Sequence, residues 1–186
     1  MLRPDNSNYT SLPNHDRNTI RIHNNTIYRH CTARINYTTY DMRRDYDTIN
    51  PRTHPFIMVP SPETEIDTHP FWYAAVLGIF HAEVQHTGRL SSDLRPKIIE
   101  FLWIRWLGPV HGHYSGRQQA KLPKLSFFPD DDEFGFGFLD PSLVLRGCHF
   151  IPAFADGRKV EPATPNDMET RLSGFLDDWN HYYVGV

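Results

Sequence analysis

Two apolar runs in the middle of the chain set the expected architecture. They are FWYAAVLGIFHAEV, residues 71–84, and IIEFLWIRWL, residues 98–107. Aromatic and β-branched residues dominate both runs, and no polar stripe recurs with the 3.6-residue period of a helix, so we predict two neighbouring strands. Pro70 precedes the first run and Gly78 interrupts it, which also disfavours a helix. Gly78 predicts a bulge or a sharp bend.

Burial of the first run is expected to change along its length. Its early positions are apolar on both sides of the pleat, and from His81 onward polar residues alternate with apolar ones. This pattern is typical of a strand that is covered on both faces at its start and on one face at its end.

Shorter patterns on both sides predict further strands. Residues 26–40 alternate well enough for one or two strands, and residues 56–59 form a short strand that Pro60 ends. Residues 143–154 predict another strand, with Pro152 at an edge position or at the end of the strand, and residues 179–186 predict a closing strand. The count is five to seven strands joined by long loops. The fold class is therefore mainly β, as a small coiled sheet or a barrel.

One short helix is expected near the C-terminus. Asn166 can cap it with Glu169 at its third position, and Met168, Leu172 and Phe175 then share one face.

The chain is long enough for one domain with a core. It has 186 residues, of which 39% are hydrophobic, and its fifteen prolines indicate many loops. Residues 1–25 are polar without periodicity and predict a flexible arm, so residues 26–186 are expected to form the single β-rich domain.

The net charge and the cysteine content exclude few classes of function. The net charge of −3 gives no overall attraction to nucleic acid, although a local basic patch remains open. Cys31 and Cys148 show no CxxC spacing, so a reduced intracellular environment is the simpler interpretation, and one long-range disulfide stays an alternative. No apolar run reaches the length of a membrane span, so no membrane association is expected.

One segment of mixed charge has two interpretations. It contains Asp41, Asp45 and Asp47 together with Arg43 and Arg44. Such a mixture is typical of a self-paired surface segment. The alternative is a metal-dependent nuclease or other hydrolase that uses the three carboxylates. No P-loop, dinucleotide fingerprint or nucleophile elbow is present, and we predict no catalytic residue, no metal site and no cofactor.

Several blocks of the sequence resemble one family of transposon proteins. In chain order the blocks are HCTARINYTTYDMRRDYDTIN at 30–50 followed by PRTH, HPFWYA at 69–74, GIFHA at 78–82, FLWIRW at 101–106, FGFLDP at 136–141, LVLRGCHFIPAF at 143–154, Gly157-Arg158, Asp178-Trp179 and Tyr182-Tyr183-Val184. They are similar to patterns in proteins encoded by mushroom DNA transposons of the Plavaka type, which are associated with the Kyakuja, Dileera and Zisupton transposase groups. A set of motifs in the right order is more specific than any single one.

The resemblance implies a function without strand-transfer chemistry. The blocks resemble the C-terminal part of longer transposon proteins, downstream of the region expected to hold the DNA-cleaving carboxylates. We therefore expect a fragment or domesticated tail that acts as a non-enzymatic binding module on chromatin, nucleic acid or a transposase partner. Its expected location is intracellular, with the nucleus as the candidate compartment. The sequence departs from the family pattern at Ala75, where the family has Arg, at Leu107, where it has Phe, and at Val186, where family members continue.

A second similarity concerns the barrel alternative. The order of strands is similar to the small barrels of chromatin modules, especially bromo-adjacent-homology, Tudor-like and SH3-like folds. In such a barrel, Trp72, Tyr73, Trp103 and Trp106 are candidates for an aromatic groove that holds a methylated lysine, with Tyr73 and Trp106 as the first pair to examine. The alternative is that these rings belong to the core.

Four arginines are candidates for contact with nucleic acid. They are Arg43, Arg44, Arg52 and Arg105. Gathered on one side, they would make binding strongly dependent on salt. Scattered surface charge is the simpler alternative for a chain with a negative net charge.

Overall fold

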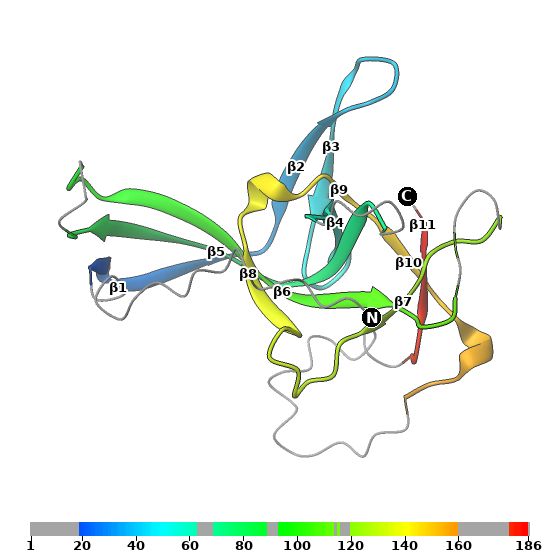
Figure 1. The fold of residues 1–186 in the computed structure, drawn as a ribbon. Coiled ribbons are helices and arrows are strands. Elements are labelled where there is room, and N and C mark those ends of the chain that lie inside the picture. Colours follow the sequence, from blue (N-terminus) through cyan, green and yellow to red (C-terminus); the bar gives the residue numbers. More distant parts are fainter. Residues whose placement is uncertain are drawn as a thin grey trace.

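The fold is built almost entirely of antiparallel strands. A computed structural model describes residues 19–62, 69–88, 93–113, 115, 120–159 and 179–185. Within these residues the strands are β1 (Ile20–His30), β2 (Ala33–Thr38), β3 (Arg44–Ile49), β4 (Phe56–Pro60), β5 (Phe71–His86), β6 (Lys97–Pro109), β7 (Lys124–Phe127), β8 (Phe136–Leu139), β9 (Arg146–Gly147), β10 (His149–Pro152) and β11 (Tyr182–Gly185), and two short 3-10 helices are η2 (Pro141–Leu143) and η3 (Phe154–Asp156) (Figure 1).

The strands form two open sheets. Nine of them follow the order β10-β11-β7-β6-β5-β4-β9, with β1 added to β5 and β8 added to β6, while β2 and β3 form a separate two-stranded sheet. The predicted mainly β fold is confirmed. The closed-barrel alternative is wrong, because the strand order ends at β10 and β9 without joining them. The described residues hold eleven strands rather than five to seven. Strands β3, β7 and β8 were not expected, and residues 143–154 form two strands, β9 and β10, instead of one.

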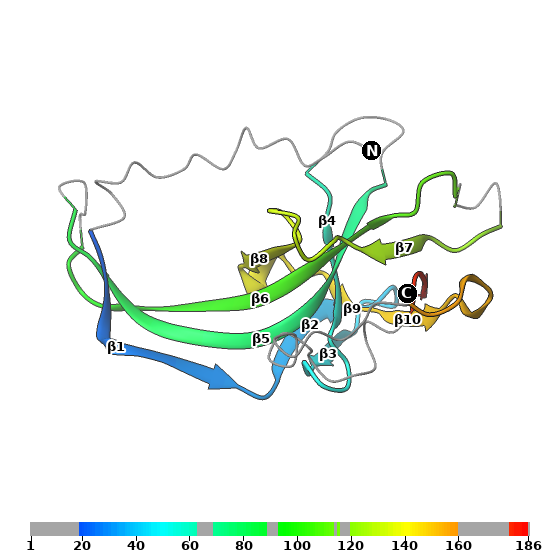
Figure 2. The ribbon, with the colours of Figure 1, turned by 90° about the horizontal axis from the view of Figure 1, so that it is seen from below.

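The two apolar runs pair as expected. Strands β5 and β6 are antiparallel neighbours whose register runs from Tyr73 opposite Leu107 to Val84 opposite Lys97. The register shifts between Val76 and Gly78, which confirms the predicted bulge. Figure 2 shows both strands as long, curved ribbons, with β1 alongside β5.

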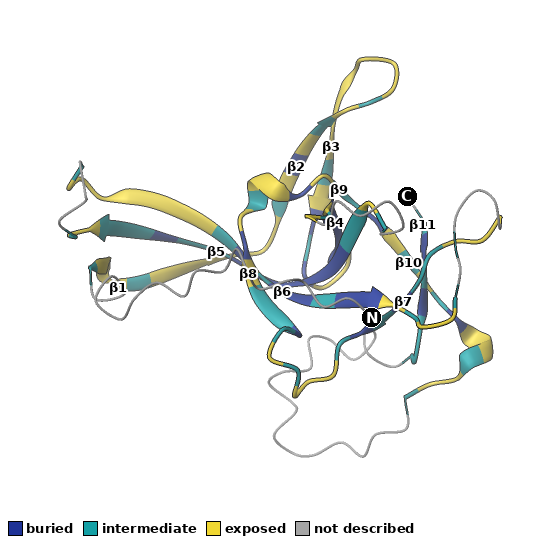
Figure 3. Ribbon diagram, in the orientation of Figure 1, coloured by how far each residue is buried: buried dark blue, intermediate teal, exposed yellow. Residues whose placement is uncertain are grey.

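Side chains on the two faces of β5 and β6 belong to two core clusters. Ala74 and Val76 pack with Ile104 in the first core cluster, and Tyr73 packs with Leu107 in the second core cluster. This division follows from the alternation of side chains along a strand. Burial on β5 is almost complete from Tyr73 onward and becomes partial after Ile79, which confirms the predicted change along the strand (Figure 3).

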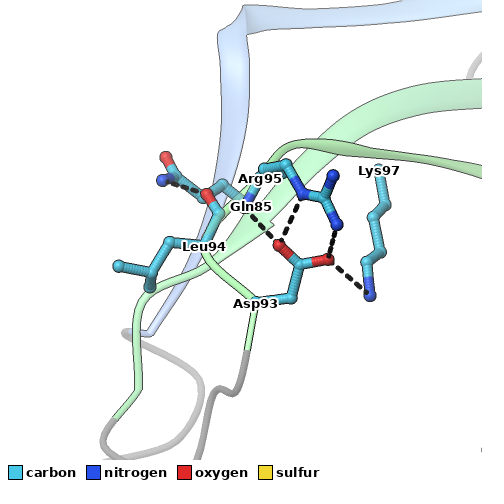
Figure 4. Close-up of polar contacts among 5 residues, drawn as sticks. All are labelled: Gln85, Asp93, Leu94, Arg95 and Lys97. Atoms are coloured by element: carbon cyan, nitrogen blue, oxygen red, sulfur yellow. Dashed lines mark hydrogen bonds and ion pairs between the residues drawn. The ribbon is translucent and has the colours of Figure 1, made fainter.

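Beyond the core, β1, β5 and β6 form a projecting three-stranded arm (Figures 1 and 2). At its end, Asp93 accepts hydrogen bonds from the Arg95 guanidinium at 3.1 and 3.3 Å and lies 3.6 Å from the Lys97 ammonium (Figure 4). The bonds from Arg95 lower the pKa of Asp93 below its ordinary value. The Gln85 amide also donates to the carbonyl of Leu94 at 2.6 Å, so polar contacts join the two strand ends.

Strand β11 confirms the predicted closing strand and is fixed by a charged cluster. Asp156 accepts a 2.7 Å bond from His181, just before β11, and lies 2.5 Å from the ammonium of Lys124 on β7. Hydrogen bonds from Lys124 and His181 hold the pKa of Asp156 below its ordinary value. One carboxylate therefore links η3 to two neighbouring strands.

Several sequence expectations concern the ends of the chain and its cysteines. Strand β1 begins at Ile20, so residues 20–25, expected in the flexible arm, belong to a strand. The predicted helix around residues 166–175 lies outside the described residues. Both cysteines are free: Cys31 is exposed, and burial raises the pKa of the Cys148 thiol to about 12. No helix among the described residues has the length and apolar character needed to cross a membrane.

The close approach at the bulge yields a prediction. A Cβ added at Gly78 would overlap the ring of Phe80, which folds back over the strand and stacks on Phe101. We expect Gly78→Ala to lower the free energy of unfolding by about 1–3 kcal/mol, because the ring must move. Urea unfolding followed by tryptophan fluorescence measures the change.

Two variants test the cause of that loss. Gly185→Ala is the matched control, because its nearest neighbour is 4.0 Å away and the change is expected to stay within about 0.5 kcal/mol. Combining Gly78→Ala with Phe80→Ala should cost less than the sum of the two single changes. Strictly additive effects would contradict the steric explanation.

Candidate nucleic-acid interface

The β2–β3 hairpin presents a polar and basic face to solvent. Its register pairs Ala33 with Ile49 at one end and Thr38 with Arg44 at the other. Because side chains alternate along each strand, every second residue points away from the body. The outer face, defined by these outward residues, consists of Arg34, Asn36, Thr38, Arg44, Tyr46 and Thr48, and all six are exposed. It contains two arginines and no carboxylate.

The opposite side of the hairpin anchors it to the body. Ile35 and Ile49 are buried in the first core cluster. Asp47 accepts a 2.9 Å bond from the backbone N–H of Gly147 on β9, and its carboxylate lies 3.6 Å from the guanidinium of Arg146. These contacts fix which face of the hairpin points outward.

Arg146 and Tyr37 extend this anchor toward the tip of the hairpin. The Arg146 guanidinium lies 4.3 Å from the centre of the Tyr37 ring and donates to its hydroxyl at 3.4 Å. Burial and the neighbouring Asp47 raise the pKa of Tyr37. The phenol therefore stays protonated at neutral pH and serves as a packing surface for Arg146.

A tight turn closes the hairpin at its tip. The backbone N–H of Thr39 donates to the carbonyl of Arg43 at 2.8 Å, and Met42 has a positive φ of 63°. Asp41 accepts a bond from the Thr39 hydroxyl and forms a 3.0 Å ion pair with Arg43. Arg43 is thus neutralised by Asp41 at the turn, so it contributes less basic charge than Arg44.

On the outer face, one arginine lies against the one aromatic ring. The Arg34 guanidinium is 4.9 Å from the centre of the Tyr46 ring. Tyr46 is half exposed and lies opposite Asn36 in the register. The contact holds the Arg34 side chain against the ring, and because Arg34 is exposed, its guanidinium is accessible to an anion.

The four sequence-predicted arginines do not form one patch. Arg44 lies on the outer face and Arg43 at the tip. Arg52 is exposed in the turn that follows β3, where its N–H donates to the side chain of Asn50 at 2.9 Å. Arg105 is only 8% exposed, so its burial does not favour a contact with nucleic acid.

Arg105 has structural partners instead. Its guanidinium lies 4.7 Å from the centre of the Phe127 ring and 5.3 Å from that of Phe136. It donates to the carbonyl of Phe128 at 3.2 Å and to the carboxylate of Asp130, with which it forms an ion pair. Arg105 therefore joins β6 to the segment between β7 and β8.

The three carboxylates of the enzymatic alternative have separate roles. Asp41 pairs with Arg43, Asp47 anchors β9, and Asp45 accepts a 2.8 Å bond from the N–H of Tyr46. Among the described residues, no group of three or more His, Cys, Asp or Glu side chains is placed to hold a metal ion.

The four aromatic candidates lie on two faces of the sheet. Trp72 and Trp106 meet edge to face, with ring centres 5.6 Å apart, and pack on the first core cluster. Tyr73 and Trp103 belong to the second cluster, and burial raises the pKa of Tyr73 to about 12. The structure therefore does not bring the four rings into one groove, and Tyr73 and Trp106 do not share a face.

Sequence reasoning missed Arg34, Asn36 and Tyr46 as neighbours. The signal that could have found them is the alternation within residues 33–38, which puts Arg34, Asn36 and Thr38 on one face of a strand. The partner strand was missed because its charged residues predict a surface segment. Comparisons with protein-family models, curated proteins and solved structures gave no match for this chain.

Burial separates the expected effects of two arginine substitutions. Arg105→Ala should lower the free energy of unfolding by about 2 kcal/mol, because it removes the packing of the guanidinium between two rings. Arg44→Ala, on the exposed outer face, should change it by less than about 0.5 kcal/mol. Urea midpoints measured under the same conditions check the difference, and equal midpoints would contradict the structural role of Arg105.

Proposed function

We propose that this chain is a non-enzymatic binding module, derived from a transposable-element protein, that contacts nucleic acid through the outer face of the β2–β3 hairpin. The observation that carries the proposal is the composition of that face: Arg34 and Arg44 are exposed and no carboxylate lies among the six outward residues. Guanidinium groups match phosphate oxygens in charge and geometry.

Net charge does not argue against this assignment. The chain carries a net charge of −3, but electrostatic effects between exposed groups are screened beyond about 8 Å in physiological salt. Near the outer face, the carboxylate of Asp41 is paired with Arg43. The side chains of Asp45 and Asp47 belong to the opposite face, where Asp45 accepts a bond from the backbone N–H of Tyr46 and Asp47 lies beside Arg146. The local charge of the outer face is therefore positive.

The transposon resemblance supports the same partner class. It implies chromatin, nucleic acid or a transposase as partner, and nucleic acid is the one whose phosphates the outer face matches directly. The block at residues 30–50 that carries this resemblance also includes both strands of the hairpin. The proposal places the protein in the nucleus, where such a partner is found.

Two arginine pairs provide the test of this function. The variant Arg34→Ala/Arg44→Ala should weaken binding to a labelled nucleic acid in fluorescence anisotropy and lower the slope of log K against log salt concentration by about 1.4–1.8, for two lost phosphate contacts. The matched control Arg21→Ala/Arg95→Ala removes the same charge from the projecting arm.

The control decides between a site and a general charge effect. We expect Arg21→Ala/Arg95→Ala to leave the affinity and the salt slope close to those of the unchanged chain. Equal losses in both double variants would show that net charge rather than the hairpin governs binding. Absence of salt-dependent binding in the unchanged chain would contradict the proposal itself.

A further inference from the structure

We infer that the β2–β3 hairpin enters the major groove of duplex DNA, with Asn36 at the base edges and Arg34 and Arg44 at the phosphates. This inference rests on the proposed function and names its substrate class. It is carried by three features of the hairpin: its width, the order of side chains along it, and its content of aromatic rings.

The hairpin has the dimensions of a groove-binding ribbon. Strands β2 and β3 have six residues each and pair with each other in a two-stranded sheet, which projects from the body (Figure 1). Six strand residues span about 20 Å, and two strands lie about 4.8 Å apart. The major groove of B-form DNA, about 12 Å wide and 8.5 Å deep, admits a ribbon of two strands.

The outer face carries its polar groups in a suitable order. Asn36 lies opposite Tyr46 in the middle of the ribbon, whereas Arg34 lies toward the body and Arg44, opposite Thr38, lies toward the tip. The two arginines are four residue positions apart along the ribbon, about 13 Å. They lie on different strands, so a ribbon that runs along the groove presents one arginine to each phosphate backbone while its centre faces the bases.

Asn36 is the residue suited to reading sequence. It is exposed at the centre of the outer face. The amide of an asparagine has one donor and one acceptor side, which match the N6 and N7 edge of adenine in the major groove. We therefore expect a preference for an adenine at one position of the bound site.

The outer face does not fit the other common nucleic-acid forms. Surfaces that bind single strands stack successive bases on several exposed rings. Here the outer face has one ring, Tyr46, and the Arg34 guanidinium lies over it. A duplex of RNA has a deep, narrow major groove that side chains cannot read.

The experiment compares defined probes with the full chain. Fluorescence anisotropy at one ionic strength would measure binding to a 20-base-pair DNA duplex, to each of its single strands, and to the RNA duplex of the same sequence. We expect the DNA duplex to bind at least about tenfold more tightly than the other probes. Methyl green, which occupies the major groove, should displace the protein, and netropsin, which occupies the minor groove, should not.

Variants separate base reading from phosphate contact. From a pool of random duplexes, the preferred sequence is selected and one adenine at a time is replaced. Asn36→Ala should reduce the discrimination at one adenine by about tenfold, the range expected for a lost bidentate contact. Arg34→Ala/Arg44→Ala should instead weaken all duplexes to a similar extent.

The outcomes distinguish this inference from the function on which it rests. Binding to single strands or to duplex RNA as tight as to duplex DNA would overturn the groove inference and leave nucleic-acid binding intact. Displacement by netropsin alone, or unchanged discrimination in Asn36→Ala, would also overturn it. Failure of every probe to bind would overturn the proposed function as well.

Discussion

The pairing of β5 with β6 is the interaction on which the rest of the structure depends. A strand has two edges, and each of these long strands uses one edge for the other and its second edge for two shorter strands. The second edge of β5 pairs with β4 near the start of the strand and with β1 near its end. That of β6 binds β8 in its middle and β7 near its end. Every other strand of the large sheet attaches through these four.

The same pairing decides which side chains can act together. Its register places Ala74 opposite Trp106 and Tyr73 opposite Leu107, so Trp72 and Trp106 share one face and Tyr73 lies on the other. Rings adjacent in sequence are thereby separated by the thickness of the sheet. The hairpin, by contrast, is packed on one face only, and the alternation that buries Ile35 exposes a complete row of polar side chains.

The sequence predicts what depends on local pattern and misses what depends on distant partners. The central strands and the bulge at Gly78 follow from composition and alternation, and the structure confirms them. Strand β3 is not predictable in that way, because its inward Asp47 is satisfied by Arg146 and Gly147, about one hundred residues away. Arg105 resembles a surface arginine in the sequence, and its burial depends on rings and a carboxylate more than twenty residues further along the chain.

Native-state hydrogen exchange tests the central claim most directly. If β5 and β6 are the strands to which all others attach, their central amides, such as those of Val76 and Ile104, exchange only when the whole domain unfolds. Their exchange free energies should then equal the global free energy of unfolding, whereas amides of the β2–β3 hairpin should exchange through smaller openings. Central β5 and β6 amides that exchange as fast as those of the hairpin would contradict the account.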